Sequence, residues 1–230
     1  LGLNYVAPSL FSQPEMEGNY EGVYATISQF KKGSGDEVQK YTRYTVTSQH
    51  ITSEVGFAPE GFGSSFSKFF GVVGEDHEVA DSAFDAGLVI TGNPVHASAI
   101  FDVATRRRVR DFFNAYSEGI TLENKILTFE IQSELDPVHG AQVIPSMVEL
   151  AHCLKMEHSE VPERLRKNAT EDPNPFVAIR NLENLQKAYP TVADKAAPQI
   201  AKNVGSTMIQ IVAAGLSGPE GISVEALHRM

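Results

Sequence analysis

The chain has a single cysteine, Cys153, no apolar run long enough to cross a bilayer, and a shortage of positive charge. One cysteine excludes an intrachain disulfide and gives no sign of adaptation to an oxidising compartment, so a cytoplasmic location is expected. The richest apolar run, 209–216, is far shorter than the roughly 18 residues that a membrane-spanning helix needs. We therefore expect no membrane span within this chain.

Acidic residues outnumber basic ones by 29 to 19, which gives a formal net charge of −10. A protein of this charge is repelled by phosphate backbones and by anionic lipid headgroups, so nucleic acid is not expected as a partner. The length of 230 residues and the hydrophobic content of 42% are ordinary for one or two globular domains.

The first part of the chain predicts an α+β domain over 20–158, built mainly on an antiparallel sheet. Residues 1–19 contain proline and glycine without periodicity and predict an irregular lead-in. Segments rich in β-branched and aromatic residues at 20–30 and 39–52 predict an antiparallel pair of strands. The glycine- and phenylalanine-rich stretch 55–74 has no pattern that assigns its structure.

Further elements are predicted in the second half of this domain. A buried strand is expected at 83–91, and a hairpin is expected over 120–135 with Asn124 and Lys125 at its turn. Asp102 is a suitable N-cap for an amphipathic helix that reaches Tyr116. A second helix is expected from Ala141, because apolar residues recur on one of its faces at Val143, Met147, Leu150 and Leu154.

Residues 159–230 predict a short all-α segment, because the strand signals stop and prolines punctuate the chain. Shifting this segment against itself by about 31 residues superposes apolar positions, for example Leu165 on Ala196 and Leu185 on Leu216. This period indicates about two paired-helix units, and 222–230 would begin a truncated third one.

The first of these units reads Asn168-Ala169-Thr170-Glu171-Asp172-Pro173-Asn174-Pro175-Phe176-Val177, followed by Arg180, Leu182 and Leu185. This pattern resembles a HEAT-type helical repeat, and the resemblance implies a surface that binds proteins. Two units are few for a solenoid, since its repeats stabilise one another through their neighbours. We therefore expect the unit to pack on the N-terminal domain or on another subunit.

A second resemblance covers 36–153 and is carried by two short runs. They are Glu78-Val79-Ala80-Asp81-Ser82-Ala83-Phe84-Asp85, and Ile100-Phe101-Asp102 leading into Arg106-Arg107-Arg108. These runs are similar to bacterial domains of unknown function, which often follow membrane-spanning helices and in some cases precede helical repeats. The resemblance implies a membrane tether in a longer parent protein, with this chain on its cytosolic side.

Two groups of side chains are candidates for binding a protein partner, whose identity the sequence leaves open. The first group shares the outer face of the second repeat helix and comprises Arg180, Glu183, Asn184 and Lys187. The second is the dense basic patch on the helix after Asp102, formed by Arg106, Arg107 and Arg110 together with Arg108. For every one of these residues the alternative is a solvated surface position.

No catalytic, cofactor or metal site is predicted. Cys153 has histidines at 152 and 158, but on a helix these positions point in other directions, so an ordinary helix cysteine is favoured over a nucleophile. The histidine spacings do not place two imidazoles on one helix face, and the acidic stretch 75–85 lacks an EF-hand pattern. Within that stretch Asp85 is expected to be structurally paired, and the run 61–66 lacks the residues of a phosphate-binding loop.

These observations favour a non-catalytic interaction or scaffold module. Two alternatives stay open. One is a hydrolase or phosphate-handling enzyme with a site around the glycine- and phenylalanine-rich stretch, His77 and the acidic residues. The other is a small-ligand sensor in the α+β domain that is read out by the helical repeat.

Overall fold

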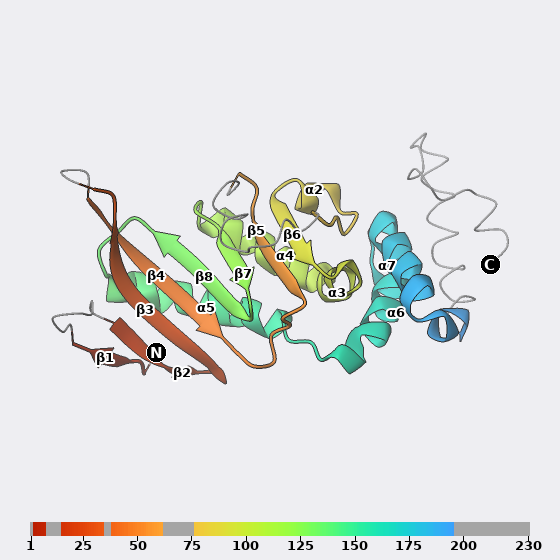
Figure 1. The fold of residues 1–230 in the computed structure, drawn as a ribbon, viewed down its shortest axis with the longest axis horizontal. Coiled ribbons are helices and arrows are strands. Elements are labelled where there is room, and N and C mark those ends of the chain that lie inside the picture. Colours follow the sequence, from red (N-terminus) through yellow and green to blue (C-terminus); the bar gives the residue numbers. More distant parts are fainter. Residues whose placement is uncertain (1, 8–14, 35–37, 62–75, 196–230) are drawn as a thin grey trace.

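The computed structural model describes residues 2–7, 15–34, 38–61 and 76–195, and its main feature is one eight-stranded sheet (Figure 1). Every neighbouring pair of strands is antiparallel. In chain order the strands are β1 (Asn4–Val6), β2 (Glu15–Tyr20), β3 (Val23–Lys32), β4 (Gln39–Thr47), β5 (Val55–Pro59), β6 (Leu88–Gly92), β7 (Ile120–Glu123) and β8 (Ile126–Ile131). Across the sheet their order is β1-β2-β3-β4-β8-β7-β5-β6.

Each helix is preceded by a polar residue at its N-cap position, and in the sequence the helices lie between the strands and after them. They are α2 (Ser82–Asp85), α3 (Pro94–Ile100), α4 (Val103–Ala115), α5 (Pro137–Cys153), the 3₁₀ turn η2 (His158–Glu160), α6 (Val161–Glu171) and α7 (Pro175–Ala188). Four of them start at a side chain that accepts a backbone N–H of the first turn, namely Asn93, Asp102, Asp136 and Asn174. Together with the sheet, these helices confirm the α+β prediction.

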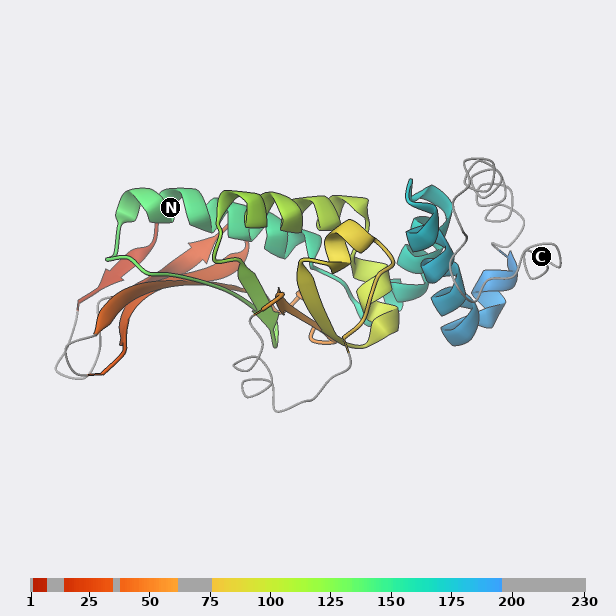
Figure 2. The same cartoon turned by 90° about the horizontal axis from the view of Figure 1, so that it is seen from above.

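Alternation along the central strands gives the sheet one apolar and one polar face. In β3 the side chains of Val23, Ala25 and Ile27 are buried, and in β4 those of Tyr44 and Val46 are buried. Figure 2 shows α4 and α5 lying along one face of the sheet, and these apolar side chains form the core beneath them. The other face carries a row of threonines on four neighbouring strands, Thr26, Thr45, Thr128 and Thr121.

Several predicted elements are confirmed. The antiparallel pair is β3 and β4, and the helix after Asp102 is α4, whose Thr105 N–H donates to the Asp102 carboxylate. The predicted hairpin is β7 and β8, joined by Asn124 and Lys125 with positive φ angles of 48° and 69°. Such angles are those of a two-residue turn that follows the twist of its strands.

Two local predictions are wrong, and one helix was not predicted. Residues within 1–19 are not all irregular, because β1 and β2 extend the sheet there by pairing with each other and with β3. The segment 83–91 is not one strand, since the turn of helix α2 buries Phe84 and the strand begins only at Leu88. Helix α3 was not predicted, because its seven residues are too few to show a helical period.

The C-terminal helices continue the core of the sheet domain. α6 and α7 pack on each other and both pack on α3, so of the two arrangements predicted for this unit, on the N-terminal domain or on another subunit, the structure has the first. Val161, Leu165 and Leu185 belong to the same apolar cluster as the sheet residues. The break predicted between the two helices lies at 172–174. No helix among the described residues is long and apolar enough to cross a bilayer.

Candidate functional site

Arg106, predicted as part of an exposed basic patch, is buried, so its prediction as a partner-binding residue is wrong. It is 1% exposed and its guanidinium is held from three sides. Nε donates to Asp81 at 2.9 Å, and Nη1 donates to the Phe101 carbonyl at 2.8 Å. Nη1 and Nη2 reach the two carboxylate oxygens of Asp172 at 3.0 and 3.1 Å. A buried cation needs such partners, because desolvation of an unpaired charge is costly.

The remaining arginines of this patch stay at the surface, and each has an acidic neighbour. Arg107 is the most open, with 82% of its side chain exposed and Asp111 at 3.8 Å. Arg108 contacts Glu149 at 2.6 Å, and Arg110 lies 4.0 Å from Asp81. The exposed pairs formed by Arg107 and Arg108 contribute little to stability. The patch is therefore a partly neutralised helix surface beside one buried arginine.

Polar contacts fix the C-terminal helix pair to α3 and α4. Asp172 lies at the break between α6 and α7. Its carboxylate forms an ion pair with Arg106, and its side chain is 1% exposed. Asn168 of α6 donates to the carbonyls of Ser98 and Ala99 at 3.1 and 3.2 Å. Asn184 of α7 donates to Ser98 Oγ at 2.8 Å. These contacts come from separate elements, so they define one orientation of the helix pair.

The four residues predicted on the outer face of α7 divide into two groups. Arg180, Glu183 and Lys187 are exposed and form a charged row along the helix. Arg180 and Glu183 are 3.7 Å apart, which is a weak surface pair. Asn184 is half-buried and turns toward α3, where Ser98 accepts its hydrogen bond.

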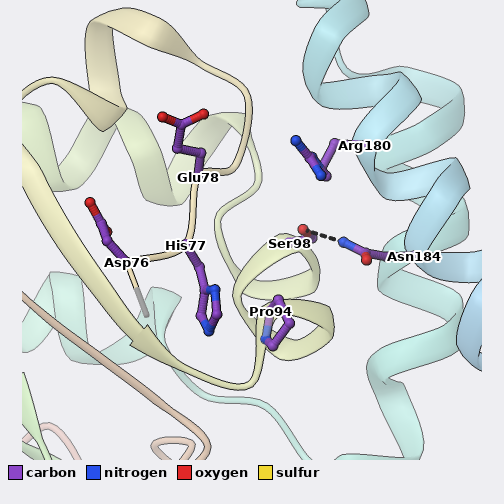
Figure 3. Close-up of a pocket in the computed structure, with 7 residues that line it drawn as sticks. All are labelled: Asp76, His77, Glu78, Pro94, Ser98, Arg180 and Asn184. Atoms are coloured by element: carbon purple, nitrogen blue, oxygen red, sulfur yellow. Dashed lines mark hydrogen bonds between the residues drawn. The ribbon is translucent and has the colours of Figure 1, made fainter. Parts of the chain in front are cut away.

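A cleft of about 450 Å³ lies between α7 and the segment 76–78 (Figure 3). Its lining residues are Asp76, His77, Glu78, Pro94, Ser98, Arg180 and Asn184. It therefore brings together two sets of residues that the sequence assigned to different hypotheses: Arg180 and Asn184 to partner binding, and His77 with the acidic residues to an enzyme.

Two of these residues already hold the outer edge of β6. The backbone N–H of His77 donates to the Ile90 carbonyl at 2.8 Å, and His77 Nε2 donates to the Gly92 carbonyl at 2.8 Å. One carboxylate oxygen of Asp76 accepts from the Ile90 N–H at 2.9 Å. This edge is thereby covered rather than left open to another strand.

The acidic residues that follow the cleft segment have structural partners. Asp81 binds Arg106, and Asp85 accepts the Val79 N–H at 3.1 Å, as predicted for a paired residue. Burial raises the pKa of Asp85 to about 6. Among the described residues no group of three or more histidine, cysteine or acidic side chains is placed to hold a metal ion. Glu75 lies outside the described residues.

A second, smaller cavity of about 150 Å³ lies beside His96 of α3. His96 is 3% exposed, and its Nδ1 has no hydrogen-bond partner among the described residues. Its ring is 5.1 Å from that of His158, at the start of η2. Burial lowers the pKa of His96, and the charge of Glu54 acts in the opposite sense. Nothing in the sequence around His96 indicated this environment.

Cys153 ends α5 and is half-buried. Burial raises the pKa of its thiol, which lowers the fraction of the reactive thiolate. The neighbouring His152 is turned away, since its Nε2 bonds the Glu21 carbonyl at 3.0 Å. The geometry agrees with an ordinary helix cysteine.

Parts of the sequence hypotheses fall outside the described residues. Most of the second repeat unit and the truncated third one lie within 196–230, and most of the glycine- and phenylalanine-rich stretch lies within 62–75. No family model, curated protein or solved structure matches this chain. The HEAT-like assignment and the resemblance to bacterial domains of unknown function therefore stay predictions.

Proposed function

We propose that this chain is a non-catalytic protein-interaction module whose partner binds the exposed face of α7. One observation carries the proposal: the inner side of α7 is committed to α3 and α6, while Arg180, Glu183 and Lys187 stand exposed in a row on its outer side. A helix face presented in this way offers a row of anchor positions at helical spacing.

The contacts that hold α7 against the rest of the protein support this proposal. The Arg106–Asp172 pair lies at the start of the connection to α7, and the Asn184–Ser98 hydrogen bond lies in its third turn. Because the helix is held at both places before any partner arrives, binding does not require it to be ordered, and preorganisation of this kind strengthens association. The helix–break–helix order of α6 and α7 is also what a HEAT-like unit requires.

The charges of the row indicate the character of the partner surface. Two cations and one carboxylate alternate along α7, so a partner with an acid opposite Arg180 or Lys187 gains complementarity. Charges at the rim of an interface act mainly on association rate and on the choice of partner. We therefore expect the interaction to weaken with rising salt.

Affinity capture from the native cells tests this function. The full chain is compared with a variant that carries Arg180→Ala, Glu183→Ala and Lys187→Ala. The control variant carries Lys40→Ala and Glu134→Ala, which remove an exposed ion pair of 2.7 Å between β4 and the segment after β8. We expect a protein that is captured by the parent and the control and lost from the α7 variant. Identical capture by all three chains would refute the proposal.

A further inference from the structure

The cleft between α7 and the segment 76–78 has opposite charges on its two walls. Figure 3 shows Arg180 extending from α7 toward the segment that carries Glu78. Both side chains line the cleft, and both residues are exposed. Among the described residues Arg180 forms an ion pair with Glu183 at 3.7 Å and none with Glu78. The two charges thus face one space without neutralising each other.

The floor of the cleft supplies neutral hydrogen-bonding groups. Ser98 Oγ accepts the Asn184 amide, so the Ser98 hydroxyl hydrogen is left to donate, and the Asn184 oxygen is left to accept. Asp76 also lines the cleft, next to Glu78 in the segment 76–78, and one of its carboxylate oxygens accepts the Ile90 N–H. One wall is therefore cationic, the opposite wall is acidic, and the floor is polar.

This arrangement discriminates among classes of small molecule. A phosphate ester or a dicarboxylate would meet Arg180 favourably but would be repelled by Asp76 and Glu78. A polyamine would be attracted by Asp76 and Glu78 but repelled by Arg180. An apolar ligand would leave all of these polar groups without partners, at a large cost in desolvation. A molecule with an ammonium group at one end and a carboxylate at the other satisfies both walls.

We propose that this cleft binds a short peptide with free termini, its carboxylate on Arg180 and its ammonium group on Glu78. The guanidinium of arginine presents parallel N–H donors that match both oxygens of a carboxylate. Asn184 and Ser98 lie beneath the peptide backbone, where an amide oxygen and a hydroxyl can pair with its N–H and C=O groups. The volume of about 450 Å³ lies within the range of small-ligand sites.

The proposal goes beyond a protein-binding face, because the ligand lies at the junction between α7 and the sheet domain. A peptide that touches both Arg180 and Glu78 links the C-terminal helix pair to the segment beside β6. Glu183 and Lys187 do not line the cleft. A variant that carries only Glu183→Ala and Lys187→Ala, with Arg180 unchanged, therefore tests partner capture without altering the cleft, and loss of partner capture and loss of peptide binding are separate results.

Calorimetric titration of the full chain tests the inference with alanine, dialanine, trialanine and tetraalanine as probes. The concentration of each probe is raised to about 10 mM, which is high enough to detect binding with a dissociation constant of about 1 mM. We expect one length to bind best, since the separation of its termini must match that of the two walls. Acetylating its amino end or amidating its carboxyl end should each weaken binding about tenfold or more, because each removes a charged hydrogen-bonding group.

Two variants assign the ends of the peptide. Glu78→Gln should abolish the difference between the free and acetylated probes, and Arg180→Met should abolish the difference between the free and amidated probes. Both residues are exposed, so both variants are expected to fold, which circular dichroism checks. If no probe binds, or if capping either end leaves the affinity unchanged, the proposal is overturned.

Discussion

Replacing Arg106 by methionine tests whether the buried ion network holds the C-terminal helices in place. The substitution keeps a long side chain but removes every hydrogen bond from the guanidinium. Two carboxylates are left behind, Asp172 with 1% and Asp81 with 11% of the side chain exposed. Neither has another described cation closer than the 4.0 Å that separates Asp81 from Arg110.

The expected loss follows from that burial. Removing one partner of a buried ion pair destabilises a protein by about 3–5 kcal/mol, because the charge left behind has no compensation. This free energy is not reduced for solvent screening, because the Asp172 side chain is almost fully buried. A domain of this size has a free energy of unfolding of about 5–15 kcal/mol, so the loss is a large fraction of the whole. Adding Asp172→Asn to Arg106→Met should recover part of it, since the second substitution removes the unpaired charge.

Urea unfolding at neutral pH measures these differences. Arg107→Ala is the matched control, because Arg107 lies on the same helix and is 82% exposed, and it should change the free energy of unfolding by less than about 0.5 kcal/mol. Hydrogen exchange should show that Arg106→Met raises exchange in α6 and α7 more than in β3 and β4. A loss below about 1 kcal/mol, or no recovery in the double variant, would show that the buried ion network does not hold the C-terminal helices in place.

Three further predictions concern single positions. Burial lowers the pKa of His96 below its usual value of about 6.5. The contribution of His96 to stability is therefore complete above that pH and falls as the pH drops. His96→Gln should make the midpoint of urea unfolding depend less on pH. Burial raises the pKa of Asp85 to about 6, so its contribution is present in acid and is lost as the pH rises through that value. At neutral pH, Asp85→Asn should therefore stabilise the fold by about 1 kcal/mol, allowing for its half-exposed position. Gly92→Ala should cost more than about 3 kcal/mol in thermal or urea unfolding, because φ is +98° and the added Cβ would clash with the Glu54 carbonyl; Gly22→Ala, at φ +78° in open space, should cost only about 1–2 kcal/mol.

The elements that the sequence predicted well are those with a long period or a local turn signal. Helix α4 shows its apolar spacing over 13 residues and is preceded by a capping aspartate, and the β7–β8 hairpin is marked by its two-residue turn. By contrast, β1 is a strand only because β2 pairs with it, and its three residues carry no pattern of their own. Short elements of this kind depend on tertiary pairing, which no local window contains.

The candidate site was predictable only in its surface residues. The helical period placed Arg180, Glu183 and Lys187 on the outer side of α7, where they are exposed. The same reasoning placed Arg106 among exposed arginines, because its two carboxylate partners lie 25 and 66 residues away in the sequence. The cleft depends on the packing of α7 beside the segment 76–78, so neither helix periodicity nor motif spacing could indicate it.

Site-specific photo-crosslinking at Lys187 in the native cells tests whether α7 is the face that binds the partner. The crosslinking residue replaces the exposed Lys187 in one strain and the exposed Lys40 on the sheet in another. We expect a discrete protein adduct from position 187 that is absent from position 40 and reduced by Arg180→Ala and Glu183→Ala. Equal adducts from both positions, or none from position 187, would contradict this prediction.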